Sequence, residues 1–294
     1  MLKMYQKHAH SGSSVELWEE NWEATQFNQS LQFCLVDPLR PLFEKYAPPG
    51  SLMLEGGCGM GQFVTFYTLR GVRVIGLDFA QRALHRLNDR IPDLPLCAGD
   101  VSALPFADES FDLYYSGGVV EHFEGGAEAS LNEARRVLKK DGVLLISVPY
   151  FSPLRRLLRP LKKDYWKKVD RAETQPGAGD LNFFQYAYKP FEFEAMLDRA
   201  GLRAIEKQGY SVIWGLYELP FFGGRSEVQS GEKAAPPEPE KEAIVLPDVG
   251  RPVRSSLVKR LVVSEDATVP VLGLGVRLMR WAAANMMMYV CRRK

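Results

Sequence analysis

A glycine-rich stretch that follows an acidic residue is the first feature able to do chemistry. Residues 54–61 read LEGGCGMG, and glycines there let the backbone turn sharply and lie close to a ligand. Dinucleotide-binding proteins use GxGxxG spacing, which holds a pyrophosphate at a helix N-terminus, whereas this loop has GxGxG. The acid would repel a pyrophosphate but would suit the cationic amino group of a methionine-like ligand. A plain tight turn is the alternative. The predicted ligand loop comprises Glu55, Gly57, Cys58, Gly59 and Gly61.

Two further acids follow later apolar runs. Asp78 is placed to accept hydrogen bonds from both hydroxyls of a ribose, and it can also cap a helix that begins near residue 80. Phe79, beside it, can lie against an adenine ring. Asp100 is expected to accept a hydrogen bond from the adenine amino group, with a simple turn acid as the alternative. The backbone of Val101 can reach a ring nitrogen.

The order of apolar runs predicts the elements that position these residues. Short apolar runs alternate with helical patterns, which indicates β-α-β units, a parallel sheet and right-handed crossovers. Ligands of such sheets bind outside the carboxyl ends of the strands, where each motif above falls. Gly117, at the end of one run, is expected to face the reactive sulfonium of the ligand. Strands are predicted at 51–55, 72–77, 95–99, 111–116 and 143–148, with helices at 62–69, 80–90 and 128–138 and a turn at Gly142.

The rest of the chain divides by composition. Residues 14–46 have helical spacing of apolar side chains, and 223–258 are polar and rich in proline and glycine. Later elements are predicted at 191–200 (helix), 203–214 (strand region), 272–284 (helix) and 285–291 (strand). The predicted units are an N-terminal helical cap at 1–48, a core at 49–150, a basic substrate-covering segment at 151–190, a continuation of the catalytic domain at 191–222, a flexible linker or disordered loop at 223–258, and a final helix and strand at 259–294.

Residues 54–149 resemble the class I S-adenosylmethionine (SAM)-dependent methyltransferases, particularly the branch with the ubiquinone and menaquinone methyltransferases. The acid-GxGxG loop, the ribose acid, the Gly-Asp before Leu-Pro-Phe and the run VLKKDGVL match in order and spacing. The resemblance implies SAM as cofactor and an α/β, Rossmann-like, doubly wound sheet of about seven strands, mostly parallel with an antiparallel last strand. Residues 285–291 suit that last strand. Glu55 departs from the family, which often has Asp there.

The reaction expected from this resemblance is methyl transfer to a small-molecule acceptor. Because a sulfonium methyl group is already activated, proximity and orientation do most of the work, and a base is needed only for an acceptor that holds its proton tightly. His122 is the candidate base, and a hydrogen-bonded histidine that only shapes the pocket is the alternative. Candidate substrate contacts are Tyr150, Tyr186 and Tyr188, although such aromatics more often pack in a core.

Two basic, apolar segments bear on the acceptor. Residues 153–171 interleave eight Lys or Arg with leucines and aromatics, which favours an anionic or lipid-like substrate or contact with a membrane surface. A solvated basic helix is the alternative. The last 44 residues hold nine Lys or Arg and several methionines, which either form a second such surface or fill the core.

Composition excludes other classes. The formal net charge of +1 over 294 residues gives no field that favours nucleic acid. The four cysteines are scattered, so we predict no metal site, no disulfides and a cytoplasmic location, with peripheral membrane contact left open. No signal peptide or spanning helix is expected. The remaining alternatives are a nicotinamide-dependent oxidoreductase and a non-catalytic module that binds a membrane or protein partner; the oligomeric state is not assigned.

Overall fold

A seven-stranded sheet forms the centre of the protein, with strand order β4-β3-β2-β5-β6-β9-β8. β9 runs antiparallel to its two neighbours, and the other pairs in this sheet are parallel. The expected mostly parallel sheet with an antiparallel last strand is therefore confirmed. The strands are β2 (Leu52–Gly56), β3 (Arg73–Asp78), β4 (Leu96–Ala98), β5 (Phe111–Gly117), β6 (Leu138–Pro149), β8 (Leu202–Tyr210) and β9 (Met286–Arg293). The computed structural model describes residues 1–6, 10–158, 160, 182–217, 219, 244–249 and 256–294.

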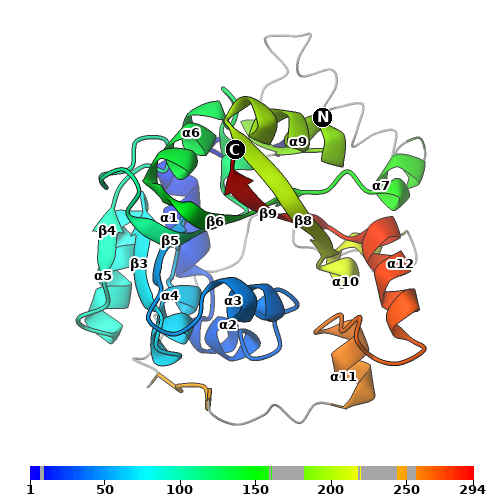
Figure 1. The fold of residues 1–294 in the computed structure, drawn as a ribbon, viewed down its shortest axis with the longest axis horizontal. Coiled ribbons are helices and arrows are strands. Elements are labelled where there is room, and N and C mark those ends of the chain that lie inside the picture. Colours follow the sequence, from blue (N-terminus) through cyan, green and yellow to red (C-terminus); the bar gives the residue numbers. More distant parts are fainter. Residues whose placement is uncertain (7–9, 159, 161–181, 218, 220–243, 250–255) are drawn as a thin grey trace.

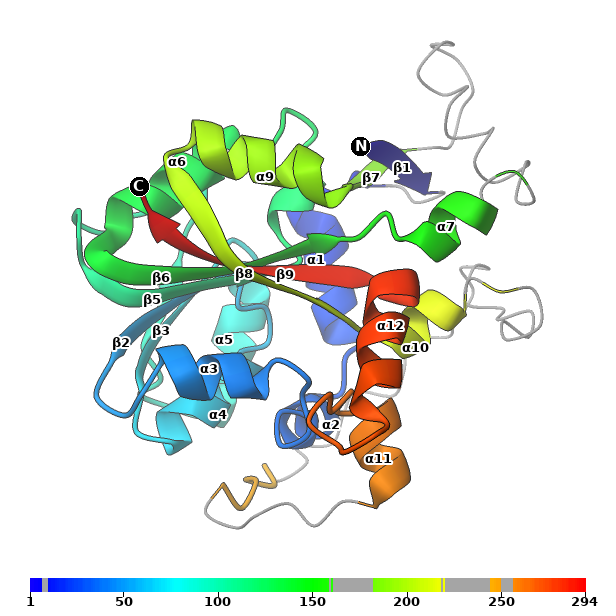
Figure 2. The ribbon, with the colours of Figure 1, turned by 45° about the vertical axis from the view of Figure 1, so that its right-hand side comes forward.

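Helices cover both faces of the sheet, as a doubly wound fold requires (Figures 1 and 2). One face carries α2 (Phe27–Phe33), α3 (Arg40–Tyr46), α4 (Gln62–Leu69) and α5 (Gln81–Arg90), whose apolar side chains share one buried cluster. The other face carries α6 (Glu128–Val137) and α9 (Pro190–Arg199), in a second cluster. β6 is buried from Val143 to Pro149, because both of its faces meet helices.

The start of the chain crosses to the carboxyl end of the sheet. β1 (Leu2–Gln6) pairs antiparallel with β7 (Asn182–Ala187) in a separate two-stranded sheet, and α1 (Val15–Glu23) follows β1. Ser14 caps α1 by accepting a hydrogen bond from the backbone N–H of Leu17. Neither β1 nor β7 is indicated by sequence periodicity, since each strand depends on a partner almost 180 residues away.

Two expectations for local structure are corrected. Gly142 does not form a turn between a helix and a strand, because β6 runs without interruption from residue 138 and the extra residues bulge from it. The register shows the bulge: Phe111 of β5 pairs with Leu138, whereas Leu113 already pairs with Val143. The strand region predicted to reach residue 214 ends at Tyr210, and α10 (Val212–Leu216) follows it.

The C-terminal part adds α11 (Leu257–Val262) and α12 (Gly273–Ala283), and a short helix, α7 (Pro153–Leu158), follows β6. Most of the predicted basic segment and of the predicted linker lies outside the described residues, and the domain boundaries stay a prediction. None of the described helices combines the length and apolar character needed to cross a bilayer. The described residues also contain no cluster of three His, Cys, Asp or Glu side chains suited to a metal ion.

Candidate functional site

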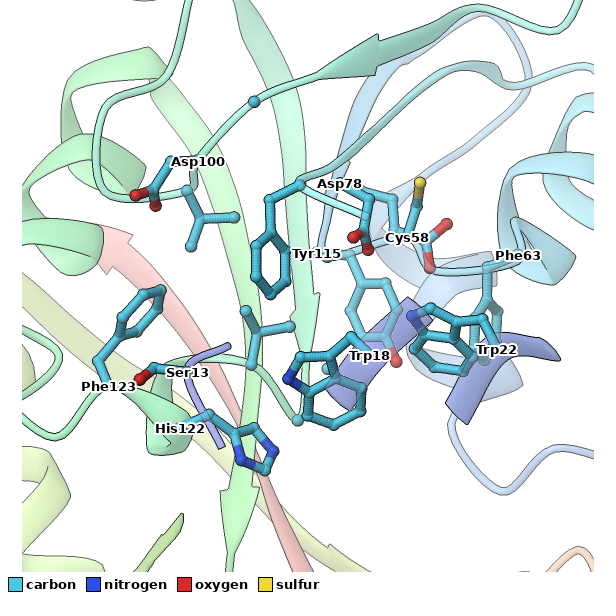
Figure 3. Close-up of a pocket in the computed structure, with 18 of the residues that line it drawn as sticks. Ser13, Trp18, Trp22, Cys58, Phe63, Asp78, Asp100, Tyr115, His122 and Phe123 are labelled. Atoms are coloured by element: carbon cyan, nitrogen blue, oxygen red, sulfur yellow. The ribbon is translucent and has the colours of Figure 1, made fainter. Parts of the chain in front are cut away.

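A pocket lies at the carboxyl ends of β2, β3 and β5, against α1 (Figure 3). Its empty space, which includes open solvent at the mouth, is about 920 Å³. Most of the predicted ligand-binding residues line it: Glu55, Gly57, Cys58, Asp78, Phe79, Asp100, Val101 and Gly117, together with His122.

The glycine loop forms the floor of the pocket. The backbone N–H groups of Gly57 and Cys58 both donate to the carbonyl of Leu77, which ties the loop to the end of β3. Gly57 has φ +79°, and a Cβ there would lie 2.3 Å from a methyl group of Val119, so only glycine fits. Gly61 is the N-cap of α4.

Gly59 and Gly61 do not line the pocket, in contrast to the other predicted loop residues. Gly59 lies under the indole of Trp22, so close that a Cβ would approach the ring to 2.6 Å. These two glycines therefore shape the loop and leave room for the side chains that pack against it, Trp22 on Gly59 and Leu87 on Gly61.

Asp78 is the last residue of β3 and is almost fully buried. Its Oδ2 accepts a hydrogen bond from the N–H of Gly59 at 2.7 Å, and its Oδ1 accepts one from Ala80 at 2.8 Å. Burial raises the pKa of this carboxyl, and the backbone N–H groups of Ala80, Gly59 and Phe79 oppose that rise. Since each carboxylate oxygen has a second lone pair, both can still accept a ligand hydroxyl. Loop anchoring and ligand binding are therefore compatible.

Glu55 presents a buried acceptor without a partner. Its side chain lines the pocket, and no described group hydrogen-bonds to Oε2. Burial raises the pKa of Glu55 well above its usual value, and the nearby charge of Asp78 adds to this. A buried carboxyl oxygen without a donor costs free energy until a partner arrives, so the site suits a cationic group.

The opposite end of the pocket has an acid at its rim and an apolar wall. Oδ1 of Asp100 accepts a hydrogen bond from Ser102, which forms a local turn, while the side chain remains exposed. Val101 is buried beside it, and Phe79 and Phe123 also line the space. Asp100 is thus a turn acid that also borders the pocket.

His122 lies on η1 (Val120–His122) and has a defined tautomer. Its Nδ1 is 2.7 Å from the carbonyl oxygen of Phe184, and because a carbonyl only accepts, Nδ1 carries the proton and Nε2 the lone pair. The imidazole packs edge-on against Trp18, with ring centroids 4.8 Å apart. Burial lowers the pKa of His122 to about 4, so the ring is neutral near pH 7.

α1 closes the pocket from above, which the sequence pattern does not reveal. Trp18 and Trp22, one helical turn apart, line the pocket, and Figure 3 shows the indole of Trp18 between Trp22 and the imidazole. Trp18 Nε1 donates a hydrogen bond to the carbonyl of Gly12. The N–H of Gly12 in turn donates to the carbonyl of Phe183 in β7. The i, i+4 spacing of the tryptophans was the available signal, but it equally indicates core packing.

Comparison with known proteins agrees with this geometry. Residues 54–146 match the model of a methyltransferase domain family. A probable SAM-dependent methyltransferase of Mycolicibacterium smegmatis is 33% identical over 127 residues, which cover 42% of this chain and 48% of that protein. A demethylmenaquinone methyltransferase of Mycobacterium sp. strain KMS is 31% identical over 170 residues, 56% of this chain and 70% of that protein. The chain belongs to the class I SAM-dependent methyltransferases.

A solved structure supports the fold. The chain superposes, with a TM-score of 0.52 and 15% identity, on a Haloferax volcanii complex of a methyltransferase activator and a candidate methyltransferase, covering 94% of this chain and 97% of that one. Against the Mycolicibacterium smegmatis relative, by contrast, the match spans only about half of that protein's length.

SAM, the cofactor of these methyltransferases, fits the residues present. The unpartnered oxygen of Glu55 offers an acceptor for the α-ammonium of the methionine part. Asp78 would hold the ribose hydroxyls, and Asp100, Val101 and Phe79, which line the same pocket, would border an adenine.

The three candidate substrate tyrosines do not line this pocket. The hydroxyl of Tyr150 donates to the carbonyl of Trp281, and that of Tyr186 donates to the carbonyl of Glu124. Tyr188 is almost fully buried, and its hydroxyl has no partner among the described residues. All three rings pack in the core, so the expectation that they contact substrate has no support in this arrangement.

Replacing Glu55 by Gln is expected to weaken SAM binding about 10- to 100-fold, because a charge-assisted hydrogen bond contributes about 1.5–3 kcal/mol. Because the pKa of Glu55 is raised, SAM affinity should depend on pH in the wild type. Wild-type affinity should rise with pH as the carboxyl ionises, whereas the affinity of the variant should not. Calorimetric titration with SAM below and above neutral pH measures both.

The same substitution should stabilise the ligand-free protein in alkali. A carboxyl whose pKa is raised on folding contributes stability below its unfolded pKa, and that contribution is lost as pH rises through the folded pKa. Gln has no proton to lose, so the variant should melt above the wild type by a margin that grows with pH. Glu128→Gln, at an exposed site, is the control. Equal affinities and parallel melting curves would contradict the assignment.

Proposed function

We propose that this protein transfers the methyl group of SAM to a small-molecule acceptor. The observation that carries the proposal is one pocket that holds a buried carboxyl with one unpartnered oxygen, Glu55, a second buried acid, Asp78, and a neutral imidazole, His122. The first two suit the cofactor, and the third is free to act on an acceptor. Nothing in the pocket favours a nicotinamide cofactor, whose pyrophosphate would meet Glu55.

The residues of the pocket would act mainly by placement. Bound SAM supplies a sulfonium-activated methyl group. Glu55 would hold the methionine part of SAM and Asp78 its ribose. Together they would fix the position of the methyl group. Such positioning contributes about 7–11 kcal/mol to a transfer between two reactants. Trp18 and Trp22 cover the space and exclude water, which protects the reactive group and strengthens the polar contacts.

His122 would receive the acceptor's proton. The carbonyl of Phe184 holds the proton on Nδ1, which leaves the lone pair of Nε2 as the base. Oε1 of the buried Glu121 lies 3.9 Å from Nε2, and burial raises the pKa of this carboxyl to about 8. Once ionised, a carboxylate at that distance would stabilise the imidazolium. A purely pocket-shaping role of His122 predicts the same contacts but no effect on the chemical step.

The walls of the pocket favour an acceptor with a ring or an apolar chain. Phe63, Tyr115 and Phe123 contribute aromatic surface beside the two tryptophans, and Ser13 adds a hydroxyl. An apolar lining with few polar groups is typical of sites for small organic molecules. No feature of the described pocket favours a polynucleotide.

The deciding experiment is calorimetric titration with SAM and S-adenosylhomocysteine, followed by methyl-transfer assays. We expect micromolar binding of both and formation of S-adenosylhomocysteine when phenolic, quinone, sugar or lipid acceptors are supplied with SAM. Binding without turnover on any acceptor would favour the non-catalytic module. If neither ligand gives heat or a thermal shift, the proposal is excluded. Titration with NADH would then test the oxidoreductase alternative.

A further inference from the structure

Six large apolar side chains stand exposed on α10, α11 and α12. Each is between 52% and 69% exposed, and no described residue covers them. They define the apolar face: Trp214, Leu257, Val258, Leu274, Leu278 and Trp281. An exposed apolar patch of this kind indicates an interaction surface.

α12 shows that the exposure is patterned. Leu274, Leu278 and Trp281 recur at i, i+4 and i+7, so they form one stripe along the helix. Val276 and Ala283 are buried on the other side and hold the helix to the protein. α12 contacts both α7 and α10. α7, α10, α11 and α12 lie on one side of the molecule in both ribbon views (Figures 1 and 2).

Among the described residues around the apolar face, the charge that stays unpaired is positive. The described acids between α11 and α12, Asp266 and Glu265, pair with Arg260 at 2.7 Å and with Arg280 at 3.3 Å. Lys259 and Arg277 are exposed and make no ion pair within the part of the chain that the structure describes. The complement of such a surface is both apolar and anionic. A bilayer with anionic lipids has this chemistry, and Trp and Leu beside Lys and Arg are typical of helices that lie in its interface.

The apolar face and the pocket share one end of the central sheet. Gly117, in the pocket wall, pairs with Ser147 of β6, and two residues later Pro149 pairs with Met286. Met286 begins β9, just after α12 ends at Ala283. α12 therefore stands at the carboxyl end of β6, the end of the sheet where the pocket lies.

We propose that the apolar face docks on an anionic membrane surface and brings the pocket to a membrane-borne, lipid-like acceptor. The acceptor part of this inference rests on the proposed methyl transfer. Docking itself rests on the exposed stripe of α12, the unpaired cations and their position at the pocket end of the sheet.

Vesicle flotation tests the docking. The full chain is mixed with phosphatidylcholine vesicles with or without phosphatidylglycerol, and bound protein is measured as a function of lipid and salt. Wild-type protein should bind the anionic vesicles, and less so as salt rises. Leu278→Ser combined with Trp281→Ser should weaken binding about tenfold, which corresponds to about 1.4 kcal/mol. Arg277→Glu should have a comparable effect.

Matched controls lie at the opposite end of the sheet. Ile205→Ser and Arg203→Glu change an exposed apolar and an exposed basic residue of β8, where Arg203 pairs with Arg292. Both variants should bind vesicles like the wild type. No binding by the wild type, or equal binding by the double variant, overturns the proposal. So does a dimer that the double variant dissociates, because a second copy then covers the apolar face.

SAM titration of the same preparations separates this inference from the proposed function. Intact SAM binding with no vesicle binding overturns the docking alone. Vesicle binding that behaves as expected, in a protein without affinity for SAM, supports the docking and removes the proposed function.

Discussion

Replacing Asp78 by Ala is expected to weaken SAM binding about 10²- to 10⁴-fold. Two charge-assisted hydrogen bonds to the ribose, at about 1.5–3 kcal/mol each, amount to about 3–6 kcal/mol. The geometry supports both bonds, because the hydrogen bonds from Gly59 and Ala80 end on different oxygens of Asp78 and each oxygen can accept more than one donor. Calorimetric titration of wild type and variant with SAM and S-adenosylhomocysteine measures the loss.

The structural role of Asp78 requires a second variant. Alanine also removes the acceptor for Gly59 and Ala80, so part of its effect could come from a displaced loop. Asp78→Asn keeps one acceptor oxygen and should lose less affinity than Asp78→Ala while retaining the wild-type circular dichroism spectrum. Asp89→Ala, an exposed acid on α5, is the control. Undiminished binding by both Asp78 variants would show that the ribose is held elsewhere.

Replacing His122 by Asn is expected to lower kcat about 100-fold, at the lower end of the usual effect of a general base. The amide of Asn can still donate to the carbonyl of Phe184, so the pocket keeps its shape while the basic nitrogen is lost. Because the pKa of His122 lies at about 4, the wild-type rate should fall only in acid, as the imidazole becomes protonated. The variant should lack that acidic limb.

Two readouts separate this role of His122 from pocket shaping. SAM affinity should be unchanged in His122→Asn, and the loss should appear in kcat rather than in KM. A variant with the wild-type kcat and pH profile would show that the histidine only shapes the pocket. A loss of SAM affinity with an unchanged kcat would lead to the same conclusion.

The core of the fold could be predicted because its signals are local. The strands that carry Glu55, Asp78 and Gly117 at their carboxyl ends are short, apolar runs, and parallel β-α-β order brings these proposed ligand residues together. The floor of the pocket follows from this order. The bulge at Gly142 does not, because register depends on the partner strand.

The roof of the pocket could not be predicted, because its contacts join distant segments. Trp18 and Trp22 show helical spacing, but only the fold shows that their face meets a pocket. For Tyr150 and Tyr186 the residue type suggests substrate contact. In the structure, both hydroxyls instead donate hydrogen bonds to backbone carbonyls in the core. An aromatic residue buries its ring in either setting, so its type alone does not distinguish them.

The pairing of β1 with β7 also affects how the protein folds. Phe183 of β7 holds the loop before α1, and Phe184 holds His122, so one strand fixes both the roof and the candidate base. Gln6 and Asn182 are register partners separated by most of the chain. Contacts with such a long loop between them close late, after the entropy of the intervening chain has been lost. We therefore expect the pocket to be completed late in folding, and a ligand that binds only the finished pocket to stabilise that step by mass action.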